Sequence, residues 1–407
     1  GPIGHALTVD GRGEYETAAL FEVDGGEIRR CAELPAGDGR SIGGAYETVT
    51  RALGFGPHGQ GQTMALAAFA EGAAERLSEA YAIHSFDEWT LDEGRLQCLA
   101  EDRAVEGDAF LSEAGRHLAA DVQAATEQAM IALAGSASPS AGAGWAIAGG
   151  VALNCRANSV LRDALGAPLW VPSSAHDSGT ALGAALEAAH VLGEPACGPL
   201  RTAGLGPQTS PEACEAAWRA HGLTPTVTDD GPGLLEAVVS RLLDGKVFGW
   251  VQGRMEFGPR ALGHRSIIGH PGRRGIQDKV NGIKSRQSWR PFGPSVLSEH
   301  VDAWFEDDDF GPFMTFTSTV REGRRAEVAG VVHTDGSTRP QRVDEDAQPE
   351  WRALIAAFHD ATGVPMLLNT SFNGRGEPIV CSPEDAILSA QRIGLDGIVL
   401  GPYLLEL

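Results

Sequence analysis

The chain has 407 residues, 43% of them hydrophobic, and a formal net charge of -22. This size and composition predict a globular protein with a sizeable core and two or three domains. The acidic excess, 54 Asp and Glu against 32 Lys and Arg, repels nucleic-acid backbones and anionic membranes, so we expect neither as a partner. The six cysteines lack the CxxC spacing of zinc sites. Because no apolar run could span a membrane and no segment resembles a signal peptide, we expect a cytoplasmic protein with reduced thiols.

The first half of the chain alternates strands, loops and helices. Residues 4–23 predict a hairpin with DGRG as its turn, and the apolar spacing of 107–135 predicts a helix. The sequence WAIAGGVAL (145–153) predicts a buried strand and a glycine turn that lead into a helix at 154–165. A second strand, loop and alanine-rich helix follow, and this helix opens near Asp177. The alternation predicts an α/β architecture.

A stretch rich in proline and glycine, 194–211, interrupts the regular pattern. We place a domain boundary there, which gives domains at 1–195 and 196–407. Beyond it, the sequence predicts helices at 211–221, 233–244, 349–362 and from Pro383, and strands at 246–252, 312–320 and 364–369.

Two aspartates follow predicted strands in small-residue turns, Asp10 in TVDGRG and Asp177 in HDSGTALG. Carboxylates at strand ends suit a divalent metal or ribose hydroxyls. The alternative is that each aspartate only forms its turn or caps a helix. Gly149, Gly150 and Asn154 form a similar turn, where bare backbone amides could hold a phosphate or could simply allow tight packing.

Positive charge gathers in the second half, starting in the stretch RMEFGPRALGHR. Arginine forks match phosphate oxygens in two-point contacts, and lysine adds a compact charge. On a helix face such residues would be solvated, but here aromatic, glycine and proline residues interleave with them. The pattern indicates one wall of a site for a small multianionic substrate. Its members are Arg254, Arg260, Arg265, Lys279, Lys284, Arg286 and Arg290.

Hydrogen-bonding side chains follow the predicted strand in VPMLLNTSFNGRGEPIV, and these are Asn369, Ser371, Asn373 and Arg375. The end of a buried strand is the edge where α/β sheets place ligand-handling groups. Arg339 lies in the turn-rich segment HTDGSTRPQ, where surface exposure is the default expectation.

From about residue 7 to its end, the chain closely resembles the O-carbamoyltransferases of antibiotic biosynthesis and nodulation-factor decoration. The resemblance rests on TVDGRGE, GGVALNC, HDSGTALGAAL, QGRMEFGPRALGHRSI, RPFGPSV, HTDGSTRPQ and LLNTSFNGRGEPIVCSPEDA, which occur in that order. It implies a partial actin-like (ASKHA) domain at 1–195 followed by a YrdC-like α/β domain at 196–407.

The resemblance also implies two reactions. The second domain would join carbamoyl phosphate to ATP, release pyrophosphate and form carbamoyl adenylate. The first would move the carbamoyl group to a hydroxyl of a small-molecule acceptor such as an antibiotic, with iron at the transfer site and Mg with ATP. The sequence leaves the oligomeric state open, although an acidic enzyme of this size is often a homodimer.

Residues are assigned to these roles by the family's motifs. The catalytic residues for gripping the anions would be Arg254, Arg260, either Lys279 or Lys284, Arg339 and Arg375. Substrate contacts would come from Arg265, Arg290, Asn369, Ser371 and Asn373. The metal would be bound by Asp10 and Asp177, and the nucleotide by Gly11, Gly149, Gly150, Asn154 and Ser178.

The sequence departs from the family in two places. The family's first domain opens with a glycine-rich strand, an HDS element and a His-x-x-x-His pair, none of which precedes Asp10, so we expect its first lobe to be missing here. Residues 54–64 read GFGPHGQGQTM where the family carries a glutamate and a lysine. Two alternatives stay open: a tRNA threonylcarbamoyladenosine enzyme, which the acidity disfavours, and a non-catalytic nucleotide-binding actin-like protein.

Overall fold

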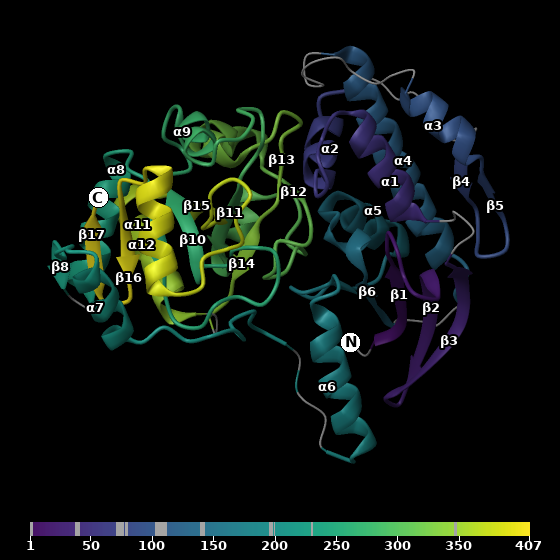
Figure 1. Ribbon diagram of the computed structural model, residues 1–407, viewed down its shortest axis with the longest axis horizontal. Helices are drawn as coiled ribbons and strands as arrows, with labels where there is room; N and C mark the ends of the chain where they lie inside the picture. The colour runs from purple at the N-terminus through teal and green to yellow at the C-terminus, as the bar shows by residue number, and fades with distance from the viewer. Residues whose placement is uncertain are drawn as a thin grey trace. The chain divides into compact units, whose positions relative to one another are not determined.

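The computed structural model describes residues 3–36, 41–70, 77, 80–101, 112–138, 143–194, 198, 200–228, 231–345 and 348–407. The chain divides into two compact units, residues 1–196 and 197–407 (Figure 1). Both units combine helices with mixed sheets, so the expected α/β class is confirmed. In the described part of the chain, no helix is long and apolar enough to cross a bilayer. The described cysteines are free, and Cys197 lies outside the described residues.

The first unit is built on a five-stranded sheet in the order β3-β2-β1-β6-β7. The expected hairpin is formed by β1 and β2, β3 pairs antiparallel with β2 at the edge, and β1, β6 and β7 run parallel. Apolar residues pair across the sheet: Leu7 faces Leu20 on one side and Ile147 on the other. The strands are β1 (Ile3–Val9), β2 (Glu16–Asp24), β3 (Glu27–Pro35), β6 (Gly144–Ala148) and β7 (Leu169–Trp170).

Helix α4 organises the helical layer of this unit because it contacts α1, α2 and α5. Ser112 caps its first turn by accepting a hydrogen bond from the amide of Gly115. The predicted helix at 107–135 is confirmed from residue 113 onward, and 107–111 lie outside the described residues. The helices are α1 (Ile42–Ala52), α2 (Gln60–Ala67), α3 (Glu93–Glu101), α4 (Glu113–Ala134), α5 (Cys155–Leu165) and α6 (Gly179–Val191), and a small hairpin joins β4 (Tyr81–Ile83) to β5 (Trp89–Leu91).

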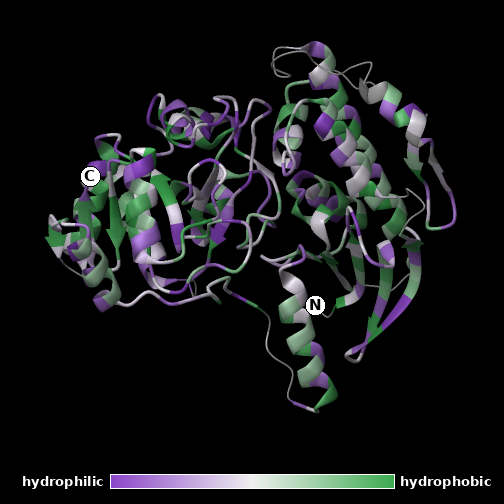
Figure 2. Ribbon diagram, viewed as in Figure 1, coloured by the Kyte–Doolittle hydropathy of each residue, from purple (hydrophilic) through white to green (hydrophobic). Residues whose placement is uncertain are grey.

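The second unit contains an eight-stranded mixed sheet in the order β14-β11-β15-β10-β9-β16-β17-β8. Strands β9, β10, β11 and β16 are buried along their whole length, and the sheet appears mostly green in the hydropathy colouring of Figure 2. The strands are β8 (Val227–Thr228), β9 (Phe248–Val251), β10 (Arg265–Gly269), β11 (Gly293–Leu297), β14 (Gln341–Val343), β15 (Met366–Ser371), β16 (Gly397–Leu400) and β17 (Tyr403–Glu406).

Helices pack around this sheet. Helix α11 contacts β11 and β15, whereas α12 contacts β9 and β16. The helices are α7 (Pro211–Ala220), α8 (Pro232–Leu243), α9 (Ile276–Ile283), α10 (Val301–Trp304), α11 (Pro349–Thr362) and α12 (Pro383–Ile393). Shorter elements are η3 (Gly150–Leu153) in the first unit and η4 (Ser298–His300), η5 (Glu322–Val331), β12 (Ser318–Thr319) and β13 (Ser337–Thr338) in the second.

One predicted strand is wrong in part. Of 312–320, only Ser318–Thr319 is a strand; Phe313 and Met314 instead bury their side chains from a loop, beside Ala203 and Leu262. The alternation of apolar residues there reflects loop packing rather than a pleated strand. The strand and glycine turn expected within 145–153 are confirmed: the strand ends at Ala148, and Gly149 adopts a left-handed φ of 96° before a 3-10 turn begins at Gly150.

Candidate functional site

Lys284 is the centre of the candidate site in the second unit. It follows the last turn of α9, and its side chain is only 7% exposed. The amino group donates to the carbonyl oxygens of Ser371 and Asn373 at 2.7 and 2.9 Å. It also contacts Ser371 Oγ at 3.3 Å and Asn373 Oδ1 at 2.8 Å. The lysine therefore ties the end of α9 to the end of β15.

Three arginines act on this lysine or on one another. Burial, then the charges of Arg286 and Arg290, lowers the pKa of Lys284 to about 7. Burial, then Arg290 and Arg339, lowers the pKa of Arg286, and burial with Arg339 lowers the pKa of Arg290. In the described residues these shifts come from burial and from other cations, without an acidic neighbour. We call Lys284, Arg286, Arg290 and Arg339 the cation cluster.

The surrounding loops hold the cluster in place. Arg286 stacks on Phe292, with its guanidinium carbon 4.2 Å from the ring centroid, and donates to Asn281 Oδ1. Arg339 precedes β14, and its carbonyl oxygen lies only 2.3 Å from where a Cβ on Gly293 would stand. Glycine is therefore required at 293 for β11 to approach this segment. Arg339 Nε is buried without a partner in the described structure.

In this cluster Lys284 is buried and the three arginines are half-buried, a setting that a negative group would complement. Buried like charges without counter-ions repel one another and lose their hydration, so they cost stability until a negative group joins them. Guanidinium forks and an ammonium group match phosphate oxygens. The cluster also concentrates positive charge within a chain of net charge -22, which favours a small polyanion over an extended one.

Arg265 has a structural role instead. It is fully buried, and its guanidinium donates to the carbonyls of Cys381, Gln252 and His264 and to Thr209 Oγ1 at 2.8 to 3.1 Å. Because these contacts occupy its nitrogens, Arg265 supports the loop rather than offering a fork to a substrate.

Glu256 shapes the same loop from the other end. Its Oε1 accepts hydrogen bonds from the backbone amides of Leu262, His264 and Arg265 at 2.8 to 3.0 Å. One carboxylate oxygen thus holds the residues that follow Arg260 in the chain. Arg260 itself is half-buried.

The remaining predicted cations lie in other settings. Lys279 is exposed, and its amino group pairs with Asp396 at 2.7 Å and donates to the carbonyl of Gly245, so the lysine of the cluster is Lys284. Arg254 and Arg375 are exposed. Arg254 makes a long contact of 3.4 Å with the carbonyl of Leu205.

The predicted polar residues of β15 divide between two tasks. Ser371 and Asn373 hold Lys284, and Ser371 Oγ also donates to Asn373 Oδ1 at 2.7 Å. Asn369 lies two residues deeper. Its amide nitrogen donates to the carbonyl of Ala261 and to Ser295 Oγ at 3.0 and 2.9 Å. Asn369 therefore braces the loop that carries Arg260.

In the first unit, the structure brings Asp10 to the paired glycines. Asp10 Oδ2 accepts from the amide of Gly150 at 3.1 Å, and Oδ1 from its own neighbour Gly11 at 2.6 Å. The amide of Gly149 donates to the carbonyl of Ala175, two residues before Asp177. The turns that follow β1, β6 and β7 thus meet at one end of the sheet.

Asn154 and Ser178 have local partners. Asn154 caps α5 by accepting from the amide of Ala157, and its side chain also exchanges hydrogen bonds with Gln123. Ser178 Oγ lies 3.3 Å from His176 Nδ1. Asp177 is exposed, and its carbonyl accepts from Thr180.

The sequence predicted a metal site at Asp10 and Asp177. In the part of the chain that the structure describes, no group of three or more His, Cys, Asp and Glu side chains could hold a metal ion. Asp10 already accepts hydrogen bonds from two backbone amides.

The sequence analysis missed the start of α1. Ser41 caps this helix and donates to the carbonyl of Gly11 at 2.7 Å. Gly43 comes so close that a Cβ there would lie 2.6 Å from the Cα of Gly11. The signal was available in SIGG, a serine followed by paired glycines at the start of a helix.

Together, the structure shows two α/β units with polar turns at strand ends, and the second unit carries the cation cluster. Comparison with known proteins names the class. The carbamoyltransferase N-terminus family matches residues 4–186, and the carbamoyltransferase C-terminus family matches residues 239–406.

Individual relatives agree with these matches. The chain is 35% identical to nodulation protein NolNO of Sinorhizobium fredii and 34% identical to nodulation protein NolO of Bradyrhizobium diazoefficiens, over 98% and 99% of its own length. It covers 60% and 78% of those proteins. A 3'-hydroxymethylcephem-O-carbamoyltransferase of Amycolatopsis lactamdurans is 34% identical over 63% of the chain and 47% of that enzyme. The chain belongs to the carbamoyltransferase family, which confirms the resemblance.

Proposed function

We propose that this protein is an ATP-dependent O-carbamoyltransferase whose second unit activates the carbamoyl group. The cation cluster carries the proposal, because carbamoyl phosphate and ATP are both polyanions and the cluster has no acidic counter-ion among the described residues. Arg339 and Arg290 would grip phosphate oxygens, while Lys284 holds the Ser371–Asn373 turn against them.

The proposed activation consumes one water molecule in its first step. Water hydrolyses carbamoyl phosphate to carbamate and phosphate. A carbamate oxygen then attacks the α-phosphorus of ATP, and the bond to the β-phosphate breaks. Pyrophosphate leaves with the electron pair of that bond, and carbamoyl adenylate forms. Positive charge near the leaving group stabilises the negative charge that develops on it.

We further propose that the first unit, as an actin-like domain, transfers the carbamoyl group, and that the second is YrdC-like. A hydroxyl oxygen of the acceptor attacks the carbamoyl carbon, AMP leaves with the electron pair of its bond, and the hydroxyl loses its proton. The small residues in the turns around Asp10 and Gly150 support a nucleotide here, because they let a phosphate approach the backbone. The acceptor would be a small molecule, in line with the name of the cephem-modifying relative.

The test is a pyrophosphate-release assay with ATP and carbamoyl phosphate and without an acceptor. We expect the wild type to release pyrophosphate, and Arg339→Ala and Arg290→Ala to lose at least about 100-fold in kcat/KM, as removal of a charged contact to a transferring group does. Lys279→Met is the matched control, because this cation pairs with Asp396 outside the cluster. Absence of release from folded wild type, or equal loss in the control, would overturn the proposal.

A further inference from the structure

Three buried polar side chains lie on the neighbouring strands β14, β11 and β15. They are Gln341, Ser295 and Asn369, and they are 6%, 0% and 2% exposed. Ser295 pairs with Gln341 in the parallel ladder, and Gly293 of the same strand pairs with Asn369 in the antiparallel one. The three residues are therefore close in space although they are far apart in the chain. We call them the polar triad.

A directed chain of hydrogen bonds joins the polar triad. Asn369 Nδ2 donates to Ser295 Oγ at 2.9 Å, and Ser295 Oγ donates to Gln341 Oε1 at 2.6 Å. Because each group in such a chain polarises the next, the bonds strengthen one another. The two amide groups have further donors, and these reach outside the sheet.

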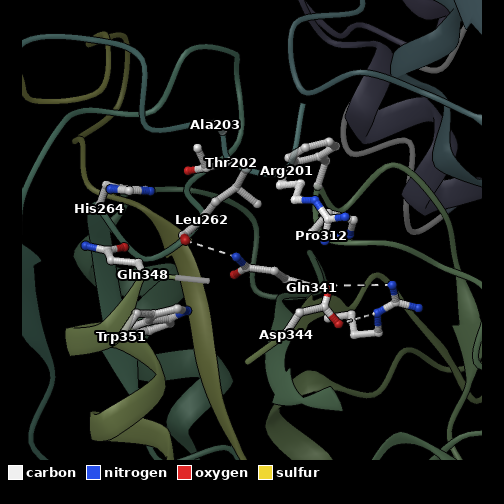
Figure 3. Close-up of a pocket in the computed structure, with 12 residues that line it drawn as sticks. Arg201, Thr202, Ala203, Leu262, His264, Pro312, Gln341, Asp344, Gln348 and Trp351 are labelled. Atoms are coloured by element: carbon white, nitrogen blue, oxygen red, sulfur yellow. Dashed lines mark hydrogen bonds and ion pairs between the residues drawn. The ribbon is translucent and has the colours of Figure 1, made fainter. Parts of the chain in front are cut away.

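Both amides of the polar triad reach the loop between β9 and β10. Gln341 Nε2 donates to the carbonyl of Leu262 at 2.9 Å, and Asn369 Nδ2 donates to the carbonyl of Ala261 at 3.0 Å. Figure 3 shows the first of these bonds as a dashed line from Gln341 to Leu262. The two carbonyls belong to the residues that directly follow Arg260, so the triad holds the chain at the point where this arginine emerges.

The same part of the loop is held from its amide side. Glu256 Oε1 accepts a hydrogen bond from the amide of Leu262, and Gln341 donates to the carbonyl of the same residue. Both backbone groups of Leu262 are thus bound to buried side chains. The start of the Arg260 side chain, two residues earlier, is fixed by these bonds together with the one to Ala261.

The sheet itself does not need polar side chains at these positions. Backbone ladders already join β14, β11 and β15, and apolar side chains would pack there without the cost of lost hydration. Asn369 Oδ1 is buried without a hydrogen-bond partner in the described structure, while its Nδ2 reaches the loop. The bonds to the loop, rather than the cohesion of the sheet, therefore account for the polar triad.

Two members of the polar triad also adjoin the cation cluster along the chain. Asn369 precedes Ser371 by two residues, and the carbonyl of Ser371 accepts a hydrogen bond from the lysine of the cluster. The period of a strand places both residues on the same face of β15. Gln341 follows Arg339 by two residues. The triad therefore ties the loop of Arg260 to two segments that build the cation cluster.

We propose that the polar triad positions Arg260 so that this arginine joins the cation cluster in binding a polyanion, and this proposal rests on the proposed function. The triad acts through the loop and makes no contact with the anion. Because a charged contact depends on accurate placement, loss of one triad bond lets Arg260 move away from the anion and weakens binding.

The test is a double-mutant cycle on pyrophosphate binding, measured by isothermal titration calorimetry on the full chain below pH 7. Arg260→Ala should weaken binding by at least about 10-fold, because a charged contact is lost. Gln341→Met and Asn369→Leu keep the side-chain size but remove the donors, and each should weaken binding roughly 5- to 20-fold. In the Arg260→Ala background, the same two substitutions should change the affinity by less than about twofold, because the arginine through which they act is gone.

Two further variants separate positioning from folding. Ser295→Ala removes only the hydroxyl between the two amides, so it should weaken binding by roughly 2- to 5-fold, again only when Arg260 is present. Thr362→Val is the matched control at the end of α11. Its hydroxyl donates to the carbonyl of Phe358 and accepts from the amide of Val364. The control should lower stability and leave the affinity for pyrophosphate unchanged.

The outcomes separate this inference from the proposed function. A wild type that does not bind pyrophosphate contradicts the proposed function itself. Wild-type affinity in the folded Gln341→Met and Asn369→Leu variants, or in Arg260→Ala, would overturn the positioning role while the wild type still binds the anion. An equal loss from the triad substitutions with and without Arg260 would likewise refute it, because the triad would then support the fold or another cation.

Discussion

The affinity of the cation cluster for an anion should fall as the pH rises above 7, because Lys284 loses its proton in the empty site. Its pKa there is about 7. A bound anion favours the charged ammonium and raises this pKa. Anion binding is therefore tightest below pH 7. Above pH 7 the site takes up a proton when the anion binds, and the affinity falls until the pH reaches the pKa of Lys284 in the bound state.

The size of the effect follows from that value. Between pH 7 and 9, the protonated fraction of Lys284 in the empty site falls from about one half to about one hundredth. If the bound lysine stays charged, affinity falls by roughly 50-fold, or about 2.3 kcal/mol. Sulfate is the suitable probe because it remains a dianion over this range, so only the protein titrates.

The assay is calorimetric titration of sulfate at several pH values in buffers of different ionisation enthalpy, which also counts the protons taken up. Lys284→Met should bind sulfate more weakly at pH 6 and lose the steep decline above pH 7. Lys279→Met should keep the wild-type profile, because its amino group pairs with Asp396. A flat wild-type profile, or the same decline in Lys284→Met, would refute the reasoning.

Two further substitutions test the residues that hold the loops of the site in place. Arg265→Lys should lower the free energy of unfolding, measured by urea denaturation, by about 3 kcal/mol. The reason is that a lysine cannot replace the buried guanidinium that donates to the carbonyls of Cys381, Gln252 and His264. A loss under about 0.5 kcal/mol would contradict the structural role of Arg265. Gly293→Ala should lower the free energy of unfolding by about 1 to 3 kcal/mol through overpacking and should weaken phosphate binding, because the new Cβ would meet the carbonyl of Arg339. Unchanged phosphate affinity would show that the close contact between Gly293 and Arg339 does not position Arg339.

The sequence predicted elements well where periodicity and capping agreed. Helix α11 begins and ends at the predicted residues, and α12 opens at Pro383 after a capping box. The strand prediction failed at 312–320, because buried loop residues such as Phe313 produce the same apolar sequence pattern as a buried strand. Backbone conformation, rather than apolar content, decides between the two.

Within the site, the sequence supplied the set of cations and not their roles. Lys279 and Lys284 fall in one short run, yet the turn of α9 directs the first toward Asp396 and leaves the second at the helix end beside Ser371. Arg265 and Arg290 are equally indistinguishable by composition. Their contacts separate them, because Arg265 is occupied by carbonyls from segments distant in the chain, and such pairings are decided by tertiary structure.

The loop between β9 and β10 has no regular secondary structure, yet Glu256 fixes three of its amides and Arg265 binds the carbonyls at its ends. In thermodynamic terms it belongs to the core: its conformational entropy is lost when the chain folds rather than when a ligand arrives. Anion binding at the neighbouring cluster then requires little further ordering, so more of the electrostatic attraction remains as affinity.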